Sequence, residues 1–369
     1  MLLKGRGSLQ DIDQFALMRP HVKKCYTLKR VKDIIPTLRE ALYLSNDGIP
    51  GPVFIETPLE VIWPQSEIEL SSGGNDKGAG KAEDESLWKR WKPNLADLYM
   101  KWHLHRVFNG GFEDLNNIEM DDKFKYITSK RAKPRPEIPY RLVLHKLLHS
   151  KQPLLVVGSQ AMLHPALTDA LIAAINALSV PVYLSGMSRG LLGVEHDLYF
   201  RHKRTVSLSQ CDVVILCGIS CDFRLGYGRS INKDAFFVHV NLDDAKLRIN
   251  SDLRKRQLAV QEDGCKFLLQ LAQHKVDLGF TLSFNDWTTD LKRRELQREQ
   301  GIDRGMEREM MTKEEGTMNT VHLCRVLNEL IEEDDTYIVA DGGDFVGAAS
   351  YLVKPRQPLH WLDPGAFSH

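Results

Sequence analysis

Five apolar runs, each followed by a turn, constrain the fold of this chain more than any other feature. They lie at residues 153–157, 180–184, 213–217, 235–240 and 258–260, and helical patterns at 141–149 and 166–178 occur in the same region. Strands that are buried on both faces lack polar alternation, so continuous apolar runs separated by helices predict a parallel sheet covered on both sides. The sequence therefore predicts a doubly wound α/β domain over residues 140–275.

Each predicted strand of this domain ends in a turn that bears glycine or a short polar side chain. In an open α/β sheet, the turns at the carboxyl ends of the strands meet at one crevice, where a nucleotide can lie. Glycine lets phosphates reach backbone N–H groups, and arginine can neutralise them. Because no turn is a complete G-x-G-x-x-G run, nucleotide binding and ordinary turn chemistry both stay open. The candidate nucleotide-site residues are Gly158, Ser159, Gly186, Arg189, Gly218, Arg224 and Asp243, the last placed to accept ribose hydroxyls.

Shorter α/β patterns flank this domain. A helical pattern at 31–42 precedes a turn cluster and a predicted strand at 53–56. Near the end of the chain, a predicted buried strand at 337–340 runs into the turn 341–347, whose glycines allow close backbone approach to a ligand. The region from 317 onward is short, and chains below roughly sixty residues are marginal on their own. We therefore expect the chain to be a piece of something larger.

Two segments have the composition of linkers. Residues 65–139 hold an aromatic helical stretch between a glycine-rich and a basic, proline-broken segment, which predicts a linker or insert. Residues 276–316 are predicted to be a charged linker. Within it, residues 290–315 mix both charges with little apolar periodicity, so we predict a solvated linker helix without a binding role. The pairs His103 with His105 and Cys217 with Cys221 lack the spacing of a metal site, and no metal ligand is assigned.

Composition excludes several classes of protein. The 49 basic and 49 acidic residues cancel, so no net field attracts nucleic acid, and we expect no nucleic-acid partner. Six dispersed cysteines are too few for a disulfide framework and predict reduced thiols. No apolar run approaches the roughly eighteen residues of a membrane span. The piece itself is expected to be soluble.

Motifs that span nearly the whole chain resemble those of a known family. They are residues 5–14, 51–58 with Val61, 186–193, 221–229, and 341–347 with 361–367. In this order, they resemble thiamine diphosphate-dependent enzymes of the acetohydroxyacid synthase and 2-hydroxyacyl-CoA lyase group. The resemblance implies a central domain flanked by partial α/β cofactor-binding domains. Residues 1–64 would end the pyrimidine-binding domain, 140–275 would form the central domain, and 317–369 would begin a truncated diphosphate-binding domain.

The resemblance also implies cofactors. Thiamine diphosphate would contact Gly343, Asp344 and Phe345 through its diphosphate, and Gly365, Ala366 and Phe367 would begin the loop under its aminopyrimidine. The central domain would hold FAD or ADP structurally. The glutamate that activates the cofactor would lie before residue 1, and the Mg²⁺-binding motif would lie after residue 369. No catalytic residue is therefore assigned, and this chain alone is expected to be inactive.

The implied activity is cleavage of a 2-hydroxyacyl-CoA to formyl-CoA and an aldehyde. An acetolactate synthase-like carboligase acting on pyruvate is one alternative, and a non-catalytic nucleotide-binding fragment is another. Expected partners are a small acyl-CoA or 2-keto acid substrate and further copies of the parent protein, as a homodimer or homotetramer. The piece is expected to face the cytosol, with any endoplasmic reticulum anchor outside it.

Overall fold

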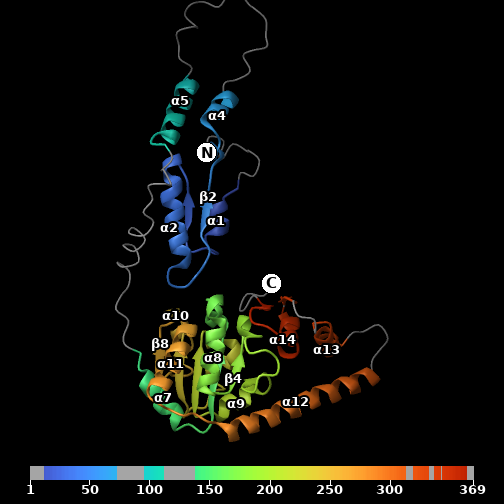
Figure 1. Ribbon diagram of the computed structural model, residues 1–369. Coiled ribbons are helices and arrows are strands. Elements are labelled where there is room, and N and C mark those ends of the chain that lie inside the picture. Colours follow the sequence, from blue (N-terminus) through green and yellow to red (C-terminus); the bar gives the residue numbers. More distant parts are fainter. Residues whose placement is uncertain are drawn as a thin grey trace, which may run out of the picture. The chain divides into compact units, whose positions relative to one another are not determined.

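The structure is a computed structural model that describes residues 12–72, 95–111, 138–312, 319–331, 336–341 and 343–363. The chain divides into two compact units, Met1–Arg135 and Pro136–His369. Figure 1 shows the elements of both units. No described helix is long and apolar enough to cross a membrane.

The first unit contains one pair of parallel strands with helices packed around it. Its elements are α1 (Gln14–Met18), β1 (Cys25–Thr27), the 3-10 helix η1 (Val31–Asp33), α2 (Ile34–Asn46), β2 (Phe54–Glu56), α3 (Leu59–Ile62), α4 (Gln65–Ser72) and α5 (Leu95–Phe108). Strand β1 pairs with β2, with Cys25 opposite Phe54. A small core joins Leu28, Val61 and Val107. The helix and strand predicted between residues 31 and 56 are confirmed.

The second unit holds the larger sheet. Its elements up to that sheet's last strand are α7 (Tyr140–Leu148), β3 (Pro153–Val157), η3 (Ser159–Met162), η4 (Pro165–Leu167), α8 (Thr168–Leu178), β4 (Val182–Leu184), η5 (Gly186–Ser188), β5 (Tyr199–Phe200), α9 (Arg204–Gln210), β6 (Val213–Cys217), η6 (Phe223–Gly228), β7 (Phe236–Val240), α10 (Asp244–Arg248) and β8 (Leu258–Val260). They are followed by α11 (Gly264–Asp277), α12 (Asn285–Thr312), α13 (Thr320–Leu330), β9 (Ile338–Val339), α14 (Gly343–Leu352) and β10 (Trp361–Leu362).

Six parallel strands form this sheet in the order β5-β4-β3-β6-β7-β8. After β3 the chain adds β4 and β5 toward one edge of the sheet, and after β6 it adds β7 and β8 toward the other edge. Right-handed crossovers in opposite directions place their helices on opposite faces. Helix α8 packs against α11, which also contacts α7 (Figure 1). The predicted doubly wound parallel sheet is confirmed, with the short edge strand β5 as an addition.

The core of the sheet extends beyond the predicted end of the central domain. Strands β3 and β6 are completely buried, as expected for strands covered on both faces. The same apolar core includes Leu282, Phe284, Trp287 and Leu291. The indole Nε1 of Trp287 donates to the carbonyl of Pro153 at 3.1 Å. The first turns of α12 therefore belong to the sheet's core, although the sequence suggested a boundary at residue 275.

Helix α12 forms where a charged linker helix was predicted, but the prediction that it is simply solvated is wrong. Leu291 and Ile302 are buried, and they lie in two different apolar clusters. Two of its carboxylates, Glu295 and Glu299, are largely buried in ion pairs. A dense mixture of charges hid these contacts, because sequence periodicity does not reveal which charges find partners in another element.

The last elements form a second, smaller cluster. Strand β9 pairs in parallel with β10, with Ile338 opposite Trp361. The prediction of a fully buried strand here is wrong, since Tyr337 and Val339 are 61% and 74% exposed. Side chains alternate between the two faces of a strand. Of residues 337–340, Ile338 and Ala340 belong to or pack against the apolar cluster, and Tyr337 and Val339 point to the other face.

Candidate functional site

The point where the strand order reverses, between β3 and β6, places two glycine turns side by side. Gly158 follows β3 and Gly218 follows β6. A Cβ on Gly158 would lie 2.6 Å from the Gly218 carbonyl oxygen, and one on Gly218 would lie 2.7 Å from the Ala161 nitrogen. Gly218 also has a φ of +68°. Only glycine fits this backbone-to-backbone contact, and ligands of doubly wound sheets bind at such a reversal point.

The turns after β4 and β7 join the same edge. Met187 N donates to Ser159 Oγ at 3.1 Å, and Gly186 lies directly against Ser159. Leu242 N donates to the side chain of Gln160 at 3.2 Å. The Asp243 carboxylate accepts from Ala245 N at 2.8 Å and so caps α10. The structure thus brings together the predicted residues Gly158, Ser159, Gly186, Gly218 and Asp243.

The two predicted phosphate-binding arginines both have protein partners. The guanidinium of Arg224 donates to both carboxylate oxygens of Asp222, at 3.0 and 2.6 Å. Arg189 donates to the Ser350 carbonyl and lies over the Trp361 ring, 5.5 Å from its centroid. The Nε of Arg189 is buried and has no hydrogen-bond partner among the described residues. Their role toward a nucleotide stays a prediction.

Strand β9 leads into α14, the segment predicted to contact thiamine diphosphate. Helix α14 begins at Gly343, with Asp344 in its first turn, and Phe345 is 44% exposed. Free N–H groups at the start of a helix that follows a strand suit a diphosphate. The backbone here therefore fits the cofactor. Gly365, Ala366 and Phe367 lie outside the described residues.

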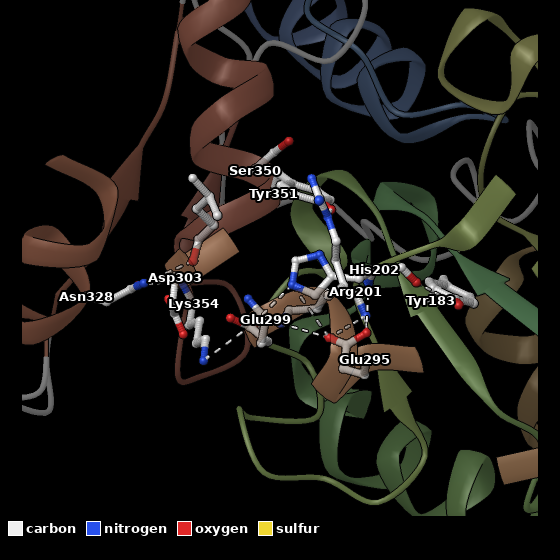
Figure 2. Close-up of polar contacts among 12 residues, drawn as sticks. Tyr183, Arg201, His202, Glu295, Glu299, Asp303, Asn328, Ser350, Tyr351 and Lys354 are labelled. Carbon is white, nitrogen blue, oxygen red and sulfur yellow. Dashed lines mark hydrogen bonds and ion pairs between the residues drawn. The ribbon is translucent and has the colours of Figure 1, made fainter. Parts of the chain in front are cut away.

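A cluster of charged groups, which we call the Glu299 cluster, connects α12 to other parts of the unit. It comprises Arg201, His202, Glu295, Glu299, Arg325 and Lys354, and Figure 2 shows most of its members. Glu299 accepts from His202 Nε2 at 3.0 Å and from Arg325 Nη2 at 2.6 Å, and it pairs with Arg201. Glu295 accepts from the His202 backbone nitrogen at 2.9 Å. The cluster therefore ties α12 to the end of β5 and to α13.

Electrostatics explain the state of Glu299. Burial alone would raise its pKa, but hydrogen bonds from His202 and Arg325 and the nearby charge of Arg201 hold the pKa far below its usual value. The carboxylate is thus charged at neutral pH. Because its charged form is stabilised by these partners, it contributes to the stability of the unit.

The same cluster offers a possible metal-ligand set, because one ligand atom each of His202, Glu295 and Glu299 lie within 4.8 Å of one another. However, both carboxylates already pair with Arg201, and Glu299 also pairs with Arg325. Guanidinium groups at this distance would repel a metal ion. The arrangement is therefore an ion-pair network.

Sequence reasoning missed the cationic segment that follows β5. Residues 201–204 read Arg-His-Lys-Arg, and this run was a usable signal. It escaped notice because β5 has only two residues, too few to register as a strand. Without that strand, nothing marked the run as part of the sheet's carboxyl edge.

Comparison with known proteins identifies the family. Residues 141–271 match the family model described as the central domain of thiamine pyrophosphate enzymes. This segment belongs to the thiamine pyrophosphate enzyme family. Its resemblance to this family, based on sequence motifs, is confirmed.

Relatives named 2-hydroxyacyl-CoA lyase 2 match nearly the whole of this chain. The Bos taurus protein is 37% identical over 367 residues, which are 99% of this chain and 54% of the relative. The Homo sapiens protein is 36% identical, again over 99% of this chain and 54% of the relative. The chain thus spans about half the length of these curated relatives.

A solved structure shares the fold. It is a thiamine diphosphate-dependent 4-hydroxybenzoylformate decarboxylase from Rhodococcus jostii RHA1, with a TM-score of 0.53 and 14% sequence identity. The match covers 98% of this chain and 56% of that chain. At this identity the likeness shows the fold alone.

Proposed function

We propose that this chain is part of a thiamine diphosphate-dependent lyase that cleaves a 2-hydroxyacyl-CoA to formyl-CoA and a shortened aldehyde. The observation that carries the proposal is the 35–37% identity, over 99% of the chain, to proteins named 2-hydroxyacyl-CoA lyase 2. The substrate would be a small molecule. Formation of acetolactate from pyruvate is the alternative that the test must separate.

Within this proposal, the chain's own residues bind and orient. The N–H groups at the start of α14, from Gly343, would hold the diphosphate, with Mg²⁺ as the counter-ion. Bound thiamine diphosphate would supply the electron sink for carbon–carbon bond cleavage. Helix α14 would be held by the loop after β4, through the bond from Arg189 to the Ser350 carbonyl, and by α12, through the 2.7 Å bond from Arg298 Nε to Tyr351 Oη. A dimer or tetramer of the whole protein belongs to the same proposal.

The test is an assay of the protein as its native gene expresses it, with thiamine diphosphate and Mg²⁺ added. We expect a 2-hydroxyacyl-CoA to yield formyl-CoA and aldehyde in equal amounts, detected by liquid chromatography. Acetolactate from pyruvate without lyase turnover would instead identify a synthase. If neither substrate reacts while the protein is folded and binds thiamine diphosphate, the proposed activity is wrong.

We also propose that the reversal point between β3 and β6 binds an adenine nucleotide, ADP or FAD. The proposal is supported by the adjacent turns at Gly158 and Gly218, and by Asp243 at the same edge of the sheet. Arg224 would exchange part of its pairing with Asp222 for a phosphate. The family's central domain gives this proposal its motivation, and the nucleotide would be structural.

Titration calorimetry of the full chain with ADP and with FAD tests the nucleotide proposal. Replacing Arg224 with glutamine should weaken binding about tenfold to a hundredfold, because a charge-assisted hydrogen bond contributes about 1.5–3 kcal/mol. Arg229→Gln is the matched control, since Arg229 lies in the same loop and is exposed. Absence of binding by both nucleotides would contradict the proposal, as would an unchanged affinity in both Arg224→Gln and Arg189→Gln.

A further inference from the structure

A cationic cavity lies at the carboxyl ends of the edge strands β4 and β5. Its volume is about 470 Å³, and α9, α12 and α14 also contribute to its walls. Five of its thirteen lining residues are cationic, and none is aspartate or glutamate. The cationic residues are Arg189, Arg201, Lys203, Arg204 and Arg298. We call it the Arg204 pocket.

The pocket is distinct from the crevice at the reversal point. Gly158, Gly218 and Asp243 do not line it, and of the predicted nucleotide residues it contains Arg189 alone. It lies instead beside the Glu299 cluster, with which it shares Arg201. Figure 2 shows Arg201 with Glu295 and Glu299, and Tyr183, Ser350 and Tyr351 of the pocket in the same region.

The cations of the pocket are only partly neutralised by protein groups. Glu295 and Glu299 pair with Arg201, yet Arg201 Nη1 remains buried without a hydrogen-bond partner among the described residues. Arg189 Nε is likewise buried without a hydrogen-bond partner among the described residues. Arg204 donates to the Arg224 carbonyl at 2.7 Å, which satisfies a hydrogen but not the charge. Buried donors without partners are costly, so these groups are arranged for an acceptor that the described residues do not supply.

The titration behaviour of the arginines agrees with this geometry. Burial and, after it, the positive charge of Arg189 lower the pKa of Arg204 to about 10, although Tyr183 and Asp222 act in the opposite direction. Burial also lowers the pKa of Arg189. A lowered arginine pKa means that the cation is disfavoured where it stands. A bound anion would stabilise the charged form of these arginines and so raise their pKa values again.

We propose that the Arg204 pocket binds the diphosphate group of a phosphorylated ligand. Several guanidinium groups converge on one cavity, and arginine is suited to multidentate phosphate recognition. Thr205 and Tyr199, which both carry a hydroxyl group, also line the cavity. Two sources share this chemistry, an adenine nucleotide and the coenzyme A part of a thioester. The inference does not depend on the proposed lyase activity, because it concerns binding to this chain alone.

Inorganic pyrophosphate is the probe that tests the pocket directly. The full chain is titrated by calorimetry at low and at high ionic strength, and binding should weaken as salt screens the charges. Arg204→Gln should reduce the affinity about tenfold or more, and Lys203→Asn about threefold, because Lys203 is exposed. Asparagine is chosen because Lys203 has a φ of +56°, which asparagine tolerates.

Lys233→Asn is the matched control, since Lys233 is exposed and precedes β7 at the opposite, amino-terminal end of the strands. Its affinity for pyrophosphate should equal that of the unaltered chain. The proposal is refuted if pyrophosphate fails to bind the unaltered chain at low salt. It is also refuted if the folded variants Lys203→Asn and Arg204→Gln both bind pyrophosphate as tightly as the unaltered chain. If pyrophosphate binds as expected, competition with coenzyme A and with ADP identifies which kind of ligand the pocket takes. Tighter displacement by coenzyme A than by ADP indicates a thioester carrier, and equal displacement indicates a nucleotide.

Discussion

Replacing Glu299 with glutamine is expected to lower the free energy of unfolding of the Pro136–His369 unit by about 3 kcal/mol. Glu299 compensates Arg201 and Arg325 in a largely buried setting, with 18% of its side chain exposed. Glutamine keeps the shape but removes the charge, so Arg201 and Arg325 lose the counter-ion that they share and keep only Glu295 and Asp303, respectively. The measurement is urea denaturation of the Pro136–His369 segment, in which Trp287 and Trp361 are the tryptophans, followed by their fluorescence. These two residues lie in the two apolar clusters that α12 connects.

The effect should depend on pH in one direction. The pKa of Glu299 is lower in the folded unit than its usual value of 4.5, because His202 and Arg325 hydrogen-bond its charged form despite burial. Its contribution is therefore complete above the unfolded pKa and declines as the pH falls below about 4.5. The difference between the unaltered chain and Glu299→Gln should shrink on acidification.

Glu307→Gln is the control for this experiment, because Glu307 lies on the same helix in an exposed position. It should change stability by less than about 0.5 kcal/mol at any pH. A loss in Glu307→Gln equal to that in Glu299→Gln would show that helix α12 responds to charge in general. The Glu299 cluster would then carry no special stability.

Replacing Gly218 with alanine is expected to destabilise the same unit by about 3 kcal/mol. Its φ of +68° is unfavourable for alanine by about 1 kcal/mol, and the new Cβ would lie 2.7 Å from Ala161 N. Relieving that overlap requires the turn after β3 to move, which strains the hydrogen bond from Gln160 N to the Gly218 carbonyl. Overpacking of this kind costs about 1–3 kcal/mol.

Gly279→Ala separates the two causes. Gly279 has a φ of +64°, but a Cβ there would meet nothing within 4 Å. Its loss should therefore be about 1 kcal/mol, from backbone conformation alone. Thermal unfolding of both variants tests the comparison. Equal losses would mean that the turns after β3 and β6 are not in the tight contact that the structure shows.

Several elements could be predicted because their signals are local. The strands at 153–157 and 213–217 are continuous apolar runs, and both appear with the same bounds. The edge strand β5 could not be predicted, because two residues carry no periodicity. The helix predicted at 290–315 exists as α12, but it begins earlier, at Asn285. Its packing on the sheet through Trp287 and Leu291 could not be predicted, because that contact joins segments far apart in the chain.

The candidate residues divide in the same way. Gly158 and Gly218 could be found because they follow strands directly, and Asp243 because it lies three residues past β7. Parallel strands align their carboxyl ends at one edge. Arg189 and Arg224 could be named as cations, but only the folded chain pairs them with the Ser350 carbonyl and Asp222. The Arg204 pocket was invisible, since its walls come from positions between residues 183 and 351.

The sequence by itself determined the parallel α/β fold and the family, because apolar runs, turn glycines and short motifs are written in consecutive residues. Tertiary structure alone decided which charges are neutralised and which are not. That outcome depends on burial and on distances between segments far apart in the chain, and electrostatic energy changes steeply with both. Glu299 and Arg204 show the two results, a carboxylate held charged by its partners and a guanidinium whose charge no described carboxylate pairs with.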